Sequence, residues 1–237
     1  MKKCFKIGIC KKPFHKSYRH TIVCNRNSFL SDGGDPCRYL AACGHASSAL
    51  YSKGIPTLRN LIQPGNKILI YGAGPVGLSF VKFTKLMGVK WVGLVDPLAN
   101  KRALALKMGA DAAFAPEEVD FPAGSFDVIV DAVGNEKIVN AAIPMIKLGG
   151  TIGVYGVISQ PTLMIEKGKG PYNFNLVIHQ WPTRWRERMA MEPLCKWIKE
   201  GRLSADEFVT HRFKISELDK ALTAVKAGEA LKVMMRF

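Results

Sequence analysis

The stretch Lys67-Ile-Leu-Ile-Tyr-Gly-Ala-Gly-Pro-Val-Gly77 is a short apolar run that ends in three closely spaced glycines. Residues 67–71 are mostly bulky or β-branched and follow the turn signal Pro64-Gly65, so they predict a strand buried on both faces. The glycines fit the pattern Gly-x-Gly-x-x-Gly, and Pro75 is pre-set for the first turn of a helix over about 76–87. The stretch therefore predicts a strand, a tight turn and a helix.

Each glycine in this turn has its own predicted role. Gly72 permits the sharp turn, Gly74 lets backbone approach a pyrophosphate, and Gly77 lets the helix pack closely on the strand. Pro75 and Val76 then begin the helix, whose free N–H groups and partial positive charge would face the phosphates. We therefore assign Gly72, Gly74, Pro75, Val76 and Gly77 as candidate cofactor-binding residues.

A second apolar run, Trp91–Val95, ends in Asp96. Asp96 lies about 20 residues beyond the glycines, where a carboxylate can accept both hydroxyls of the adenosine ribose. Strand, glycines, helix, strand and acid together predict a βαβ unit that binds a dinucleotide. The alternative for Asp96 is a helix N-cap for the segment from about Asn100 to Met108.

Beyond this unit, apolar runs continue to alternate between strand and helix patterns. This alternation predicts an α/β fold with a doubly wound parallel sheet of the Rossmann type. The further expected elements are helix 101–108, strand 112–114, strand 126–131, helix 136–147, strand 151–155 and strand 176–178. Gly88, Gly109 and Gly149 are expected as left-handed residues just past three helices.

Two later strand ends carry small residues at the edge where ligands of such sheets bind. Asp131-Ala-Val-Gly134 follows one strand, and Tyr155-Gly156 follows another. We assign Asp131, Val133, Gly134, Tyr155 and Gly156 as further cofactor-binding candidates, with room between them for the riboses and the nicotinamide ring. The alternative is that these glycines only begin connections.

Composition excludes several classes of protein. The 237 residues are 48% hydrophobic and carry a formal net charge of +15, but the basic residues do not form one stripe interleaved with aromatics, so we expect no nucleic-acid partner. No apolar run is long enough to span a membrane, and the basic N-terminus lacks the apolar segment of a signal peptide. We expect a cytoplasmic protein whose six cysteines are mostly reduced, since none form a C-x-x-C pair.

The motifs resemble the medium-chain dehydrogenases, the zinc-type alcohol dehydrogenase family, over about residues 40–237. The resemblance is carried, in the family's order, by Gly72–Leu78, Asp96, Lys107–Asp111, Asp131–Gly134, Leu148–Gly150 and Val209–Phe213. It implies an NAD-dependent dehydrogenase that takes hydride from an alcohol or polyol. Asp96 in place of a small residue favours NAD over NADP.

The same comparison exposes a departure. The family's N-terminal catalytic domain, with its first zinc-ligating cysteine and its Gly-His-Glu motif, has no counterpart here. Cys43 stands where many relatives have a further zinc ligand, but one ligand cannot hold the metal. Zinc is thus implied by the family and not supported by the residues present, and no catalytic residue can be assigned.

The resemblance also implies a division of the chain. Residues 1–46 would be a remnant of the catalytic domain, 47–200 the dinucleotide-binding domain, and 201–237 a segment that returns to the catalytic domain. The last segment is expected to hold a strand over 207–213 and a helix over 215–225 with Ser216 as N-cap. Strand 176–178 is a dimer edge in relatives, so we expect a homo-oligomer.

Three hypotheses remain open. The first is an N-terminally truncated NAD-dependent alcohol or polyol dehydrogenase. The second is a module that binds NAD without catalysis, because the alcohol-activating half is missing. The third is a methyltransferase, which also uses a glycine-rich turn but needs an acid at the end of the first strand, where Tyr71 stands.

Overall fold

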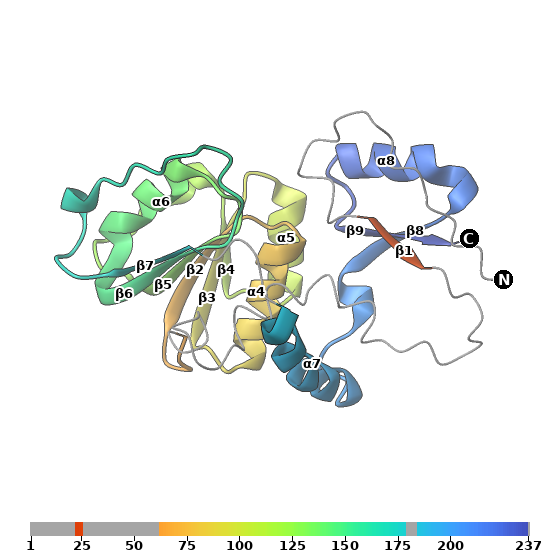
Figure 1. Cartoon of the computed structure of the whole chain (residues 1–237), viewed down its shortest axis with the longest axis horizontal. Coiled ribbons are helices and arrows are strands. Elements are labelled where there is room, and N and C mark those ends of the chain that lie inside the picture. Colours follow the sequence, from red (N-terminus) through yellow and green to blue (C-terminus); the bar gives the residue numbers. More distant parts are fainter. Residues whose placement is uncertain (1–21, 26–61, 179–183, 237) are drawn as a thin grey trace.

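The computed structural model describes residues 22–25, 62–178 and 184–236 (Figure 1). Its larger part is a six-stranded parallel sheet in the order β4-β3-β2-β5-β6-β7. The strands are β2 (Lys67–Tyr71), β3 (Trp91–Val95), β4 (Ala112–Phe114), β5 (Phe126–Asp131), β6 (Ile146–Val154) and β7 (Asn175–Ile178). The predicted doubly wound α/β fold is confirmed.

Helices cover both faces of this sheet (Figure 1). One face holds α4 (Pro75–Leu86), α5 (Ala99–Lys107) and α7 (Arg184–Lys199), and the other holds α6 (Glu136–Ala142). Side chains of β2 alternate between the faces: Ile68 and Ile70 pack with α4, while Leu69 and Tyr71 pack with α6. This alternation follows from the period of two in a strand and explains why the run is apolar throughout.

The strand order reverses at β2, which pairs with β3 on one side and β5 on the other. Loops after β2, β3 and β5 therefore leave the same carboxyl edge and diverge. In open parallel sheets this point forms a crevice that binds ligands. The glycine turn, Asp96 and Val133 all lie in these loops.

Two sequence predictions in this part are wrong in detail. The helix predicted over 136–147 ends at Ala142, and a short 3₁₀ turn, η4 (Ile143–Met145), leads directly into β6. Pro144 inside the predicted helix explains the break, since proline lacks the N–H that a helix interior needs. Gly88 and Gly109 follow helices with positive φ as predicted, but Gly149 has φ 75° inside β6.

A smaller parallel sheet joins residues from distant parts of the chain in the order β1-β9-β8. Its strands are β1 (Ile22–Asn25), β8 (Val209–Lys214) and β9 (Lys232–Arg236), and α8 (Leu218–Lys226) connects the last two (Figure 1). Ser216 is not the N-cap of α8: it lies within the turn η7 (Ile215–Glu217), where the Glu217 carboxylate accepts a hydrogen bond from the Lys214 N–H. The sequence did not predict β9.

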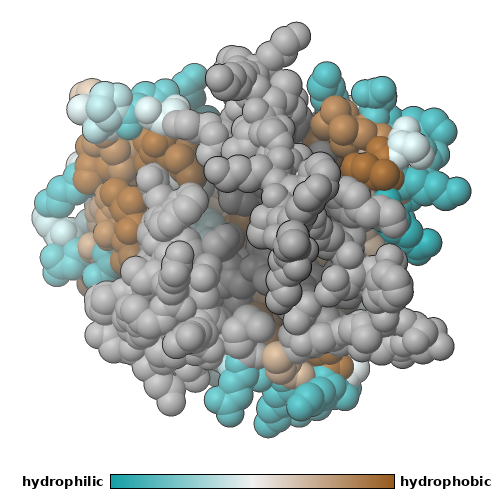
Figure 2. Space-filling model, turned by 45° about the vertical axis from the view of Figure 1, so that its right-hand side comes forward, coloured by the Kyte–Doolittle hydropathy of each residue, from teal (hydrophilic) through white to brown (hydrophobic). Residues whose placement is uncertain are grey.

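The remaining short 3₁₀ turns are η3 (Pro116–Glu118), η5 (Lys167–Lys169) and η6 (Ala205–Glu207). Figure 2 shows apolar surface at several separate places between polar side chains. Exposed large side chains on the β6–β7 connection and on edge strand β7 include Met164, Tyr172 and Ile178. Among the described residues, no helix combines the length and the apolar character that a membrane crossing requires.

Candidate functional site

The glycine turn after β2 is held by close backbone contacts. Gly72 has φ 97°, and its N–H donates to the carbonyl oxygen of Val95 at the end of β3 (2.8 Å). A Cβ on Gly77 would lie 1.7 Å from the Gly72 carbonyl oxygen, so only glycine fits there. Gly77 thus allows the first turn of α4 to pack against the turn itself, while Gly72 supplies the left-handed conformation.

Gly74 differs from its two neighbours because nothing in the structure requires a glycine there. It is the N-cap of α4 with φ −70° and ψ 177°, and a Cβ built on it would meet no atom within 4 Å. Among the described residues, no side-chain cap is found at Gly74, and no acidic residue stands in the first turn of α4. Pro75 and Val76 begin this helix, and an uncapped helix start is an arrangement that binds anions.

Asp96 ties the end of β3 to the glycine turn. Its Oδ2 accepts a hydrogen bond from the Ala73 N–H (2.7 Å), and its Oδ1 accepts one from the Leu98 N–H (2.9 Å). The N-cap of α5 is Leu98, so Asp96 does not have the N-cap role that was its alternative. Among the described residues, each carboxylate oxygen accepts one hydrogen bond and keeps capacity for another, as binding a ribose diol requires.

Two cations near Asp96 were not singled out from the sequence. Burial lowers the pKa of Lys101, and the negative charge of Asp96 opposes that shift. The Lys101 ammonium donates to the Ala230 carbonyl oxygen (3.4 Å), and Arg102 donates to the backbone oxygen of Asp96 (2.8 Å). The sequence signal that could have found them is their position five and six residues after a strand-end acid, in the first turn of a helix.

Asp131 is buried and shapes the loop after β5. Its Oδ1 accepts from the N–H groups of Val133 (2.8 Å) and Gly134 (2.9 Å), and its Oδ2 accepts from that of Asn135 (3.0 Å). Burial raises the pKa of the Asp131 carboxyl, and these three hydrogen bonds partly offset the shift. The carboxylate therefore acts on the backbone of its own loop, and it leaves the Val133 side chain 51% exposed at the edge.

The last predicted residues pack against this loop. A Cβ on Gly156 would lie 1.9 Å from the backbone nitrogen of Gly134, so the two loops can meet only through glycine. The N–H groups of Tyr155 and Gly156 both donate to the Asp131 carbonyl oxygen (2.9 Å each). The Tyr155 ring is buried edge-on against Phe80 of α4, with 5.5 Å between ring centroids.

A cavity of 510 Å³ opens at this edge between β2, β3 and α6. It brings together Gly72, Asp96 and Val133 of the prediction. The sequence did not suggest its other walls, which are Tyr71, Val95, Pro97, Pro116, Val119, Asp120, Phe121, Lys137, Ile138, Ala141, Pro144 and Met145. Most of these side chains are apolar, so the cavity suits a flat, largely apolar group attached to something held by Asp96.

The predicted metal ligand Cys43 lies outside the described residues. Within the described part of the chain, no three His, Cys, Asp or Glu side chains are grouped as a metal site needs. Cys195, in the C-terminal part of α7, is half-buried. A catalytic zinc ion needs about three protein ligands, so the described residues do not fit one.

Comparisons with known proteins agree with the motifs. Residues 75–177 match the family model described as zinc-binding dehydrogenase. D-arabinitol dehydrogenase 1 of Uromyces fabae is 31% identical over 73% of this chain and 52% of its own length, and sorbitol dehydrogenase of Bombyx mori is 28% identical over 75% and 53%. The chain therefore spans about half the length of these curated relatives. The resemblance to the zinc-type dehydrogenases is confirmed for the part that the chain covers.

Solved structures show the same fold. An alcohol dehydrogenase from Thermus sp. ATN1 superposes with a TM-score of 0.67 at 21% identity, covering 85% of this chain and 59% of that one. 2R,3R-butanediol dehydrogenase from Bacillus subtilis superposes with a TM-score of 0.67 at 20% identity, covering 83% and 57%. The chain thus shares its fold with these dehydrogenases.

Proposed function

We propose, for a chain related to the zinc-binding dehydrogenases through residues 75–177, that its carboxyl edge binds NAD. The observation that carries the proposal is the pairing of Asp96 with the glycine turn. Its carboxylate is fixed by the Ala73 N–H beside an N-terminus of α4 that has open space at Gly74. A ribose and its neighbouring pyrophosphate need these two features side by side.

In this proposal the predicted residues take different roles. Gly74, Pro75 and Val76 present the start of α4 to the pyrophosphate, and Asp96 accepts the adenosine ribose hydroxyls. The base would follow the ribose into the cavity, and Val133, Gly134, Tyr155 and Gly156 would border the nicotinamide half. Gly72, Gly77 and Asp131 would shape the backbone around the cofactor. None of the three would contact the cofactor through a side chain.

The activity we propose is oxidation of an alcohol or polyol, by analogy with relatives named D-arabinitol and sorbitol dehydrogenase. Hydride would leave the carbinol carbon for the nicotinamide, and the hydroxyl proton would be released, giving a carbonyl product. The described residues do not supply a zinc site. That finding also favours a second candidate, a module that binds NAD without catalysis.

Three further properties are proposed with the function. We propose the domain division at residues 46 and 200, and a cytoplasmic location. We also propose a homo-oligomer formed through edge strand β7, since Ile178 on that strand and the nearby Tyr172 are exposed apolar side chains. A free sheet edge with apolar neighbours is a ready surface for strand pairing between copies.

Fluorescence titration of the full chain with NADH tests the binding proposal. The expected result is saturable enhancement of reduced-nicotinamide fluorescence at micromolar NADH. Absence of saturation would reject it. Metal analysis and NADH formation from NAD with sorbitol or arabinitol then separate the two candidates, because binding without alcohol-dependent reduction favours the module.

A further inference from the structure

The turn between β3 and α5 carries Asp96, and two of its backbone carbonyl groups lie before the hydrogen-bond ladder of the helix. The first hydrogen bonds of α5 run from the N–H groups of Lys101 and Arg102 to the Leu98 carbonyl oxygen (3.0 Å each). The carbonyl groups of Asp96 and Pro97 are therefore left to other donors. Nη1 of Arg102 donates to both, at 2.8 Å to the Asp96 oxygen and 2.9 Å to the Pro97 oxygen.

The peptide group that joins Asp96 to Pro97 depends strongly on this contact. Because proline has no N–H, this peptide group can be hydrogen-bonded only through its carbonyl oxygen. That oxygen is the one to which Arg102 donates. Arg102 is half-buried, and the charge of its guanidinium makes these hydrogen bonds stronger than those from a neutral donor.

Asp96 is thereby fixed through both its backbone and its side chain. Its N–H donates to the Phe114 carbonyl oxygen (3.1 Å), and its carboxylate accepts from the N–H groups of Ala73 (2.7 Å) and Leu98 (2.9 Å). These three partners are backbone groups, whereas Arg102 contributes a side chain. Arg102 is therefore the partner of Asp96 that a substitution can remove.

We propose that Arg102 is a positioning residue for the adenosine ribose. It holds the peptide between Asp96 and Pro97 so that the Asp96 carboxylate keeps the orientation in which it accepts the ribose hydroxyls. The inference rests on the proposed function, which puts this ribose on Asp96. A carboxylate already held in its binding orientation loses less conformational freedom when the ligand arrives, and such preorganisation raises affinity. Arg102 acts through Asp96 and needs no contact with the ligand.

Two nucleotides distinguish this role from a general contribution to the stability of the turn. AMP carries both ribose hydroxyls, and 2′,3′-dideoxyadenosine 5′-monophosphate lacks them but keeps the base and the phosphate. Titration calorimetry of the full chain with each compound gives the preference for AMP as a ratio of affinities. The parent chain should prefer AMP by at least about tenfold, because the dideoxy compound cannot donate to the charged carboxylate.

The substitution Arg102→Met removes the charge and the donors but keeps an unbranched side chain. It should lower the affinity for AMP by about five- to tenfold and change that for the dideoxy compound by less than about twofold. Arg102→Lys should retain part of the preference, since an ammonium can donate to the same oxygens without the planar geometry of a guanidinium.

The matched control is Arg202→Met. Arg202 also donates to a backbone carbonyl oxygen, that of Leu86 at the C-terminal end of α4 (3.2 Å), and it is not in the cavity wall. This substitution should leave the preference for AMP unchanged. A loss of preference in both methionine variants would contradict a role specific to Arg102.

An unchanged preference in Arg102→Met would overturn the inference, whether both affinities stay the same or fall together. If circular dichroism shows that Arg102→Met does not fold, Arg102→Lys decides alone, and a preference equal to that of the parent would then overturn the inference. Failure of the proposed function is a distinct outcome: the parent chain itself would bind neither nucleotide, or would bind both equally.

Discussion

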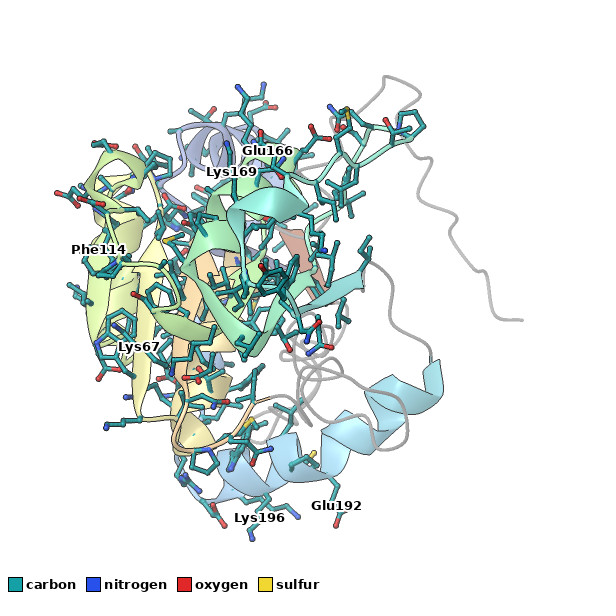
Figure 3. All side chains as sticks on the ribbon, turned by 90° about the vertical axis from the view of Figure 1, so that its left-hand side faces the viewer. Lys67, Phe114, Glu166, Lys169, Glu192 and Lys196 are labelled. Atoms are coloured by element: carbon teal, nitrogen blue, oxygen red, sulfur yellow. The ribbon has the colours of Figure 1, made fainter. Side chains whose placement is uncertain are left out.

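The two edges of the six-stranded sheet carry polar groups of the same kinds but use them differently. At the amino edge, Asp127 accepts from the Lys67 N–H (2.7 Å) and from the Lys147 ammonium (2.8 Å). The Lys67 ammonium lies 4.9 to 5.5 Å from the ring centroids of Trp91, Phe121 and Phe126. Figure 3 shows Lys67 low on the sheet and Phe114, at a carboxyl end, above it.

At the carboxyl edge, by contrast, polar groups surround open space. Among the described residues, the N-terminus of α4 has no side-chain cap, and Asp96 is fixed beside it. The amino edge is closed by its own side chains, whereas the carboxyl edge leaves these polar groups beside a cavity. The difference teaches that unmet polar groups beside a cavity, rather than charge alone, distinguish a binding edge from a structural one.

The strongest test of the comparison concerns folding of the carboxyl edge. Gly77→Ala should lower the free energy of unfolding by about 3 kcal/mol or more, because the added Cβ meets a backbone oxygen that cannot move without opening the turn. Chemical denaturation followed by circular dichroism measures the loss. Gly65→Ala at the amino-edge turn, where a Cβ meets no atom within 4 Å, is the control and should change stability far less.

The next test separates folding from binding at the same turn. Gly74→Val should leave the melting temperature nearly unchanged, since its Cβ points into open space. It should lower the affinity for NADH by about 100-fold, because the valine side chain would displace the pyrophosphate from charge-assisted contacts worth about 3 kcal/mol. Gly65→Val provides the comparison at the amino edge, and equal NADH affinity for both variants would contradict the assignment.

A smaller effect on NADH affinity is expected when an acidic residue at the carboxyl edge is replaced. Asp96→Asn should weaken NADH about tenfold, since hydrogen bonds to a charged acceptor are stronger than those to a neutral amide. Asp111 is the matched acid, because its carboxylate also accepts a backbone N–H, that of Val92 (2.7 Å), away from the cavity. Asp111→Asn should reduce stability but leave NADH affinity intact, as fluorescence titration can establish.

The smallest expected effect concerns the pH dependence of stability. Asp127 and Asp131, both in β5, should change stability with pH in opposite directions. The paired lysine and backbone N–H lower the pKa of Asp127 despite partial burial, so its stabilisation is present above about pH 4 and is lost as pH falls through its folded pKa. Burial raises the pKa of Asp131, so stability should decline as pH rises from about pH 4 through its folded pKa. Urea denaturation from pH 3 to pH 7 measures how the free energy of unfolding changes with pH. Asp127→Asn should remove the loss of stability at low pH, and Asp131→Asn should remove the decline as pH rises. Identical slopes in both variants would disagree with these shifts.

Much of the larger sheet could be predicted because its strands are short apolar runs punctuated by glycine and acid. The errors fall where local pattern and tertiary structure conflict. Residues 136–147 look helical, yet Pro144 ends the helix and β6 begins at Ile146 to pair beside Phe126. Strand β9 is short, so its sequence alone does not distinguish it from a loop. Its place between β1 and β8 in the smaller sheet is what identifies it as a strand.

The site was predictable only in its backbone motif. Gly72, Gly74, Gly77 and Asp96 share one local unit with a known spacing, so the sequence alone identifies them. The cavity is different, since its walls come from residues between 71 and 145 that meet only in the folded chain.

The pairing of β1 with β9 has a consequence for the order of events on the ribosome. Every strand of the larger sheet lies between residues 67 and 178, so that sheet can form during synthesis from one continuous stretch. Cys24 pairs with Met235, more than 200 residues later, so β1 cannot pair with β9 until residue 235 has been synthesised. In a nascent chain the crevice at the carboxyl edge can thus form before the two distant segments β1 and β9 pair.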